Sequence, residues 1–104
     1  MGTEVTLVRI YLHEADHGQH KTLMRELLDI LQAQHRVKRV TVFRGIAGFD
    51  GSGEHHVADL LRVMVDLPLV IEFFDEPPVI EAVLSAIGAL VPEGRIVSWQ
   101  ATRR

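Results

Sequence analysis

Residues 44–56 read RGIAGFDGSGEHH, and this stretch separates two apolar runs at 40–43 and 57–74. It contains four of the chain's eight glycines. Glycine tolerates positive φ and lets the backbone approach a ligand closely, and a long loop within a small domain is more often functional than incidental. We interpret the stretch as the working loop of a small binding or signalling protein.

The segments around this loop show two apolar periodicities. A period of two residues predicts four strands, at Val5–Leu12, Val40–Ile46, Leu69–Phe74 and Arg95–Ala101. Stripes on a 3.6-residue period predict two helices, one built around Leu23, Met24, Leu27, Leu28 and Leu31, the other around Val79, Ile80, Val83, Leu84, Ile87 and Leu90. Residues 57–65 fit either a helix or a strand.

Capping residues mark where the two predicted helices begin. Thr22 is the candidate N-cap of the first helix, which we expect to end near residues 34–36. Asp75 is the candidate cap of the second, because the two prolines that follow Glu76 suit a first helical turn. The Pro-Glu-Gly sequence at 92–94 ends that helix.

The predicted order of elements is β-α-β-β-α-β. The chain has 104 residues, a length that suits one domain. We therefore expect residues 1–104 to form a single α+β domain, a ferredoxin-like sandwich in which two helices cover one face of a four-stranded antiparallel sheet.

The second face of this sheet is expected to be apolar as well. Residues 5–12 carry apolar side chains on both faces, although the helices can cover only one, and an exposed apolar patch of this kind usually means a partner. We expect a homo-oligomer that buries the open face. Three charges, Arg9, Arg44 and Glu72, lie in the strands, and burying them unpaired would be costly. We expect Arg9 or Arg44 to pair with Glu72, either within the sheet or across subunits, with a ligand as the alternative partner of Arg44.

Composition excludes several classes of protein. The formal net charge of -3 does not indicate nucleic-acid binding, and the lack of cysteine removes disulfides, thiolate nucleophiles and Cys-based zinc sites. No signal peptide is visible, and we expect a cytoplasmic protein. The densest apolar run, 67–74, is too short to span a bilayer and contains Pro68 and Glu72, so we do not expect a membrane-embedded protein.

Three motifs together resemble a known family. LVRIYL at 7–12, VFRGIAGF at 42–49 followed by a histidine, and DLPLVIEFFD at 66–75 are similar to the DUF190 family, whose members are related in fold to the PII signal-transduction proteins. The resemblance covers nearly the whole chain. PII proteins carry a second glycine-rich, basic loop after the second helix, whereas residues 90–95 here read LVPEGR, with one glycine and one arginine.

The resemblance implies a trimer that binds adenine nucleotides in clefts between subunits. It also implies that the loop at 49–57 corresponds to the T-loop, which docks onto partner proteins. Carried over by position, the arginine would pair with phosphate, the glycines would give backbone access, the phenylalanine would stack and the histidine would contact ligand or partner. The ligand-binding residues expected on this basis are Arg44, Gly45, Ile46, Gly48, Phe49 and His55.

Two other classes of function stay open. Five of the six histidines lie in two loops, His13, His17, His20, His55 and His56, and imidazoles suit Zn, Cu or Ni, so a metal-binding protein is one alternative. We nevertheless expect separate, solvated histidines and no metal site. A ligand-free adaptor whose loop docks on a partner protein is the other alternative. We expect no catalytic residues, since the chain has no Cys and no Gly-x-Ser-x-Gly. The lack of Gly-Lys-Ser/Thr also excludes a phosphate-binding P-loop.

Overall fold

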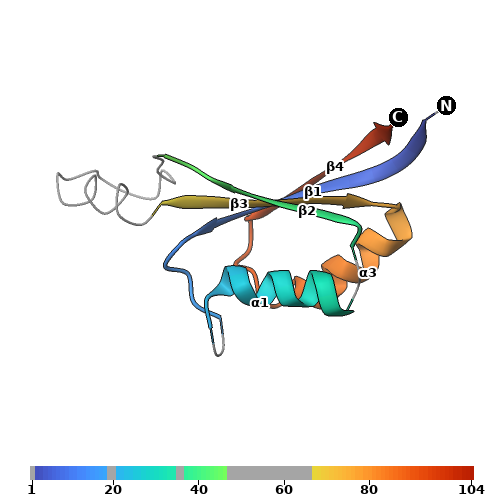
Figure 1. The fold of residues 1–104 in the computed structure, drawn as a ribbon. Helices are drawn as coiled ribbons and strands as arrows, with labels where there is room; N and C mark the ends of the chain where they lie inside the picture. Colours follow the sequence, from blue (N-terminus) through green and yellow to red (C-terminus); the bar gives the residue numbers. More distant parts are fainter. Residues whose placement is uncertain (1, 19–20, 35–36, 47–66) are drawn as a thin grey trace.

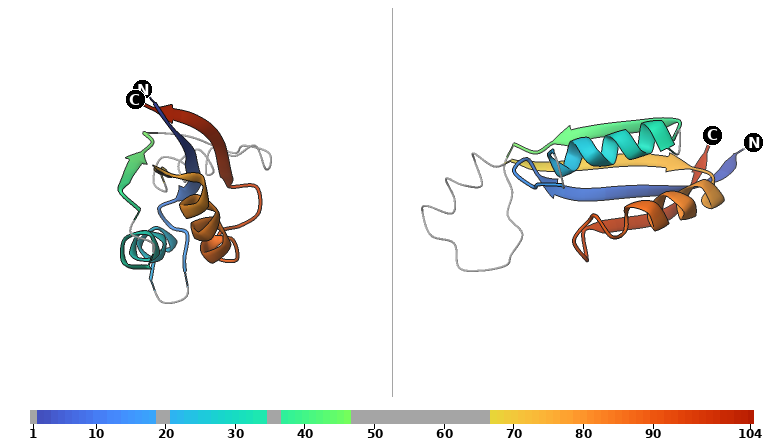
Figure 2. Two further views of the ribbon diagram at one scale, coloured as in Figure 1. Left: turned by 90° about the vertical axis from the view of Figure 1, so that its right-hand side faces the viewer. Right: turned by 90° about the horizontal axis from the view of Figure 1, so that it is seen from below.

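The computed structural model describes residues 2–18, 21–34, 37–46 and 67–104. They form four strands, β1 (Thr3–His13), β2 (Arg39–Arg44), β3 (Pro68–Asp75) and β4 (Ile96–Arg103), and two helices, α1 (Leu23–Asp29) and α3 (Pro77–Ile87), with a π-helical extension of α1 at Ile30–Gln34. The sheet order is β2-β3-β1-β4 with every neighbouring pair antiparallel. Both helices lie on one face of the sheet (Figures 1 and 2). The predicted ferredoxin-like fold is confirmed.

The core fills the layer between the helices and the sheet. Alternate residues of the two central strands point into it, among them Ile10 and Phe73, and they meet the apolar stripes of the helices, as at Leu27 and Ile80. Each of these four side chains is at most 1% exposed. Fully burying a side chain of this size contributes about 1.5–3 kcal/mol, so this layer supplies most of the driving force for folding.

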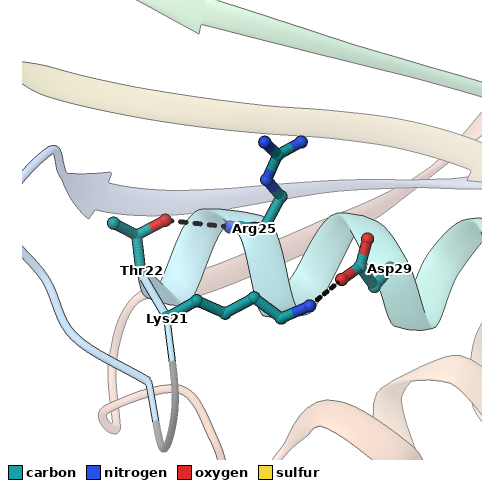
Figure 3. A network of polar contacts seen from close by, with 4 residues as sticks. All are labelled: Lys21, Thr22, Arg25 and Asp29. Carbon is teal, nitrogen blue, oxygen red and sulfur yellow. Dashed lines mark hydrogen bonds and ion pairs between the residues drawn. The ribbon is translucent and has the colours of Figure 1, made fainter.

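Helix α1 begins as its sequence predicts. The Thr22 hydroxyl accepts a hydrogen bond from the backbone N–H of Arg25 at 3.4 Å, and Lys21 forms an ion pair with Asp29 along the exposed side of the helix (Figure 3). The π-helical turn then carries the helix to Gln34, near the end that the sequence predicts. Leu31, in this π-helical turn, is fully buried.

The predicted cap of the second helix was wrong. Asp75 is the last residue of β3, and Glu76 is the N-cap without a side-chain capping bond. With Asp75 as the N-cap, the second and third helical positions would be Pro77 and Pro78, and neither proline has an N–H for a cap to accept. The buried Asp75 carboxylate accepts instead from the backbone N–H of Glu76 at 2.8 Å and of Lys38 at 3.5 Å. It therefore ties the start of β2 to the end of β3.

The open face of the sheet is apolar, as the sequence predicts. The cross-strand register places Leu7 beside Trp99 and Phe74, and Tyr11 beside Val70. The most exposed of its large apolar side chains are Tyr11 at 43%, Phe43 at 47%, Val97 at 45% and Trp99 at 42%. The helices do not reach this face (Figure 1). We name these residues, together with Arg9 and Glu72, the open face.

Arg9 and Glu72 form the predicted ion pair in the middle of the open face. They are direct cross-strand neighbours in β1 and β3, and Arg9 Nε lies 2.6 Å from Glu72 Oε2. The Glu72 carboxylate, followed by Tyr11, raises the pKa of Arg9 above its ordinary value. Arg9 also lies over the ring of Trp99, with its guanidinium carbon 5.7 Å from the ring centre. The guanidinium is thus held in place from two strands.

Candidate functional site

The base of the loop between β2 and β3 lies at one end of the sheet. Arg44 is the last residue of β2 and pairs in register with Leu69 of β3, and the backbone N–H of Gly45 continues the ladder by donating to the carbonyl of Pro68 at 2.8 Å. The predicted strand at 40–46 therefore ends at residue 44. A Cβ atom at Gly45 would lie only 2.6 Å from Cγ of Pro68, so this close approach of two strands requires glycine.

The Arg44 side chain pairs with Glu14, which the sequence analysis did not anticipate. Its Nε lies 2.6 Å from Glu14 Oε1, and the arginine side chain is 67% exposed. The expected alternative, pairing with Glu72, was wrong for this arginine because of strand parity. Arg44 stands opposite Leu69, and residues an odd number of positions apart on one strand point to opposite faces. Glu72 is therefore on the other face from Arg44.

Three of the six predicted ligand-binding residues are described by the structure. Arg44, Gly45 and Ile46 are consecutive at the loop base, and Ile46 is 92% exposed. Gly48, Phe49 and His55 lie outside the described residues, as do the 57–65 segment and the loop at 49–57. The described part of the site thus presents an exposed cation, a glycine backbone and an exposed apolar side chain next to one another.

A second ion pair lies at the same end of the sheet. Arg95, the residue before β4, places its Nη1 at 2.7 Å from Asp16 Oδ2, and the same oxygen accepts from the backbone N–H of His13 at 2.8 Å. The carbonyl of Arg95 accepts from the N–H of Tyr11 at 2.9 Å. The turn that follows β1 is therefore tied to two other segments. The Asp16–Arg95 pair joins it to the segment before β4, and the Glu14–Arg44 pair joins it to the end of β2.

Glu14, Asp16 and Arg95 are the residues that the sequence reasoning missed. One signal could have found Glu14, since it lies two residues beyond Leu12, on the face to which Arg44 also belongs. The backbone supports this turn as well, with the N–H of Glu14 donating to the carbonyl of Leu67 at 3.1 Å. The pairing of Asp16 with Arg95 joins residues 79 positions apart, which no local pattern reveals.

The chemistry of this end of the sheet is that of arginine and oxyanions. A guanidinium presents several donors in a planar fork that matches carboxylate and phosphate oxygens. Arg44 and Arg95 are both partly exposed, and each now holds a carboxylate of its own chain. Within residues 2–18, 21–34, 37–46 and 67–104, no three His, Asp or Glu side chains group so as to hold a metal ion.

Comparison with known proteins identifies relatives over almost the full length of the chain. The model of the DUF190 family, described as "Uncharacterized ACR", matches residues 5–103. A UPF0166 protein of Methanocaldococcus jannaschii is 26% identical over 91 residues, which cover 88% of this chain and 82% of that protein.

Solved structures show the same fold. CPII from Thiomonas intermedia K12, solved bound to ADP and bicarbonate, matches with a TM-score of 0.64 and 17% identity, covering 98% of this chain and 90% of CPII. A PII-like signaling protein from Thermus thermophilus matches with a TM-score of 0.56 and 14% identity, covering 97% of this chain and 88% of that one. In the described residues, no helix is long and apolar enough to cross a membrane.

Proposed function

The chain belongs to the DUF190 family and has a PII-like fold, and we propose that it is a regulatory protein that binds a small effector between its subunits. In this proposal residues 1–104 form one domain that acts in the cytoplasm, the effector is an adenine nucleotide, and the loop at 49–57 carries the signal to a partner protein. Fold alone does not specify function. The observation that carries the proposal is the exposed Arg44–Gly45–Ile46 base at the end of β2.

The subunits of the proposed assembly meet through the open face. Its aromatic and aliphatic side chains are more than two-fifths exposed at four positions, an unfavourable arrangement for a protein that works as a monomer. A second copy would remove this surface from water at roughly 25 cal/mol per Å². The family resemblance favours a trimer over a dimer, and a cleft between two subunits at the end of β2 would then contain the loop base.

The effector would bind by its phosphates and its base. Arg44 supplies a guanidinium for phosphate oxygens, and the backbone N–H groups of Gly45 and Gly48 supply further donors. Phe49 would stack on the adenine, Ile46 would cover its apolar edge, and His55 would contact the ligand or the partner protein. Support comes from CPII, which shares the fold and has been solved bound to ADP.

The signal would pass through an ordering of the 49–57 loop when the effector binds. Ordering of a segment by a ligand is a common switch, and it needs contacts that only one state of the loop makes. The proposal assigns regulation rather than catalysis to the protein, because the residues of the site are binding groups and no nucleophile adjoins a base among them.

Thermal-shift measurements with AMP, ADP, ATP and divalent metals test the proposal. A ligand that binds only the folded form stabilises it by about 2.7 kcal/mol at a hundredfold excess over its dissociation constant. We expect a shift with one adenine nucleotide that is lost in Arg44→Ala and kept in Arg25→Ala, an exposed arginine on α1 (Figure 3). No shift with any nucleotide would contradict the proposal and favour the ligand-free adaptor, and a shift with metal alone would favour the histidines.

A further inference from the structure

The turn that follows β1 places two carboxylates against the two arginines at the loop-base end of the sheet. Glu14 holds Arg44 and Asp16 holds Arg95, at 2.6 and 2.7 Å. Glu14 and Asp16 are two residues apart, so their Cα atoms lie at most about 7 Å from each other. The arginines come from the end of β2 and the segment ahead of β4, which are the two edge strands of the sheet.

We propose that this acidic turn is an internal competitor for the anionic part of the effector. The carboxylates of Glu14 and Asp16 pair with the guanidinium groups of Arg44 and Arg95, to which the phosphates of the effector would bind. The effector therefore binds by displacing the two carboxylates. The proposal rests on the proposed function for its ligand class, and it adds an autoinhibitory contact made by this chain's own residues. A ligand with too little negative charge would fail to displace the carboxylates, which gives the site a preference for polyphosphates over monoanions.

The two contacts differ in how firmly they are held. Asp16 Oδ2 also accepts from the backbone N–H of His13 at 2.8 Å, so this carboxylate is part of the turn itself. Oε1 of Glu14 is shielded from solvent but accepts no hydrogen bond from the described residues, and its contact with Arg44 is a close ion pair without hydrogen-bond alignment. A carboxylate oxygen that is shielded from water and accepts no hydrogen bond raises the free energy of the folded state. The Glu14–Arg44 pair is therefore the contact that opens first.

Release of Arg44 is sterically simple. Its side chain is 67% exposed, against 30% for that of Glu14, so the guanidinium can swing into solvent while the carboxylate stays with the turn. The backbone on both sides is held by the bonds from Gly45 to Pro68 and from Glu14 to Leu67. The switch then needs only a change of side-chain rotamer, and a ligand shifts it by the difference in its affinity for the two states.

Isothermal titration of ADP and of inorganic tripolyphosphate into the wild type, Glu14→Gln and Asp16→Asn tests the competitor. Glutamine and asparagine keep the shape and an acceptor oxygen but remove the charge. We expect Glu14→Gln to tighten both ligands by at least about fivefold, the lower end of typical coupling between sites, and Asp16→Asn to act in the same direction. The matched control is Asp29→Asn, which removes the same charge from the Lys21–Asp29 pair on α1 and should change the affinities less than about twofold.

The outcomes separate this proposal from the proposed function. If the wild type binds ADP and Glu14→Gln binds it within twofold, the competitor is refuted while effector binding stands. If neither the wild type nor any variant binds either ligand, both proposals fall. If tripolyphosphate gains as much affinity for Asp29→Asn as for Glu14→Gln, the gain comes from net charge and the competitor is again refuted.

Discussion

Arg9 of β1 and Glu72 of β3 stand directly opposite each other at the centre of an apolar sheet face, with Arg9 Nε 2.6 Å from Glu72 Oε2. Their side chains are 41% and 21% exposed, so in a single subunit water still reaches both. Exposed ion pairs contribute about 0–1 kcal/mol, whereas breaking a fully buried pair costs about 3–5 kcal/mol. The loss of unfolding free energy on breaking this pair therefore shows whether a second subunit covers the open face.

We expect Glu72→Ala to lower the free energy of unfolding by about 3 kcal/mol or more, because the proposed assembly would leave the Arg9 charge buried without its partner. Urea unfolding at fixed protein concentration measures the loss. The control is Asp29→Ala, which breaks the exposed Lys21–Asp29 pair and should cost no more than about 1 kcal/mol. Equal small losses in the two variants would mean that the open face remains in water.

The charge of Arg9 should make no contribution to the pH dependence of the unfolding free energy near neutral pH. Glu72 raises the pKa of Arg9 in the folded state, so its stabilisation is fully present below the pKa of the unfolded chain and is lost only as the pH rises through the still higher folded pKa. The difference in unfolding free energy between the wild type and Arg9→Met should stay constant between about pH 7 and about pH 9. A difference that shrinks steadily with rising pH would contradict this assignment.

Gly45 is expected to be intolerant of a side chain. A Cβ atom there would meet Cγ of the Pro68 ring at 2.6 Å, and the ring cannot turn aside as a flexible chain end would. We predict that Gly45→Ala costs about 1–3 kcal/mol of unfolding free energy. The same change made in a Pro68→Ala background should cost at least about 1 kcal/mol less, because the blocking atom is gone. Equal costs in both backgrounds would show that crowding by Pro68 is not the reason for glycine.

The N-cap of α1 provides a test of the helix assignment. Thr22→Ala removes the hydroxyl that accepts from the N–H of Arg25 (Figure 3), and at 3.4 Å this bond is long, so we expect a loss near 0.5–1 kcal/mol, roughly the lower half of the usual range. Thr22→Ser keeps the acceptor and should lose less than half as much. Thermal melts followed by circular dichroism measure both. A loss in the serine variant as large as in the alanine variant would assign the effect to the threonine methyl group instead.

Local pattern was enough to predict the elements of this fold, although α3 ends at Ile87, before the Pro-Glu-Gly sequence at 92–94 that was predicted to end it. Local pattern failed where distant residues meet. The four strands, the two helices, the Thr22 cap and the apolar open face follow from periodicity and capping chemistry, which act within a few residues. The sequence left open whether Arg9 or Arg44 pairs with Glu72. The register decides for Arg9, because Glu72 points to the opposite sheet face from Leu69, the residue that Arg44 stands beside. The cap at Asp75 was wrong because the second and third positions after it are Pro77 and Pro78, which offer no N–H.

The candidate site was only partly predictable. Arg44, Gly45 and Ile46 were expected to be ligand-binding residues from the family resemblance, and the structure puts them at one end of the sheet. Glu14 and Asp16 were missed as partners of the two arginines, because those contacts depend on which strand ends come together in the sheet. Gly48, Phe49 and His55 lie outside the described residues and remain predictions.

Native mass spectrometry of the protein with ADP, for the wild type and Arg44→Ala, tests the central claim most directly, since one spectrum reports both assembly and bound effector. We predict a wild-type trimer that carries up to three ADP molecules, and an Arg44→Ala trimer that carries few or none. A monomeric wild type at micromolar concentration, or a trimer that binds no ADP at saturating ligand, would contradict the account.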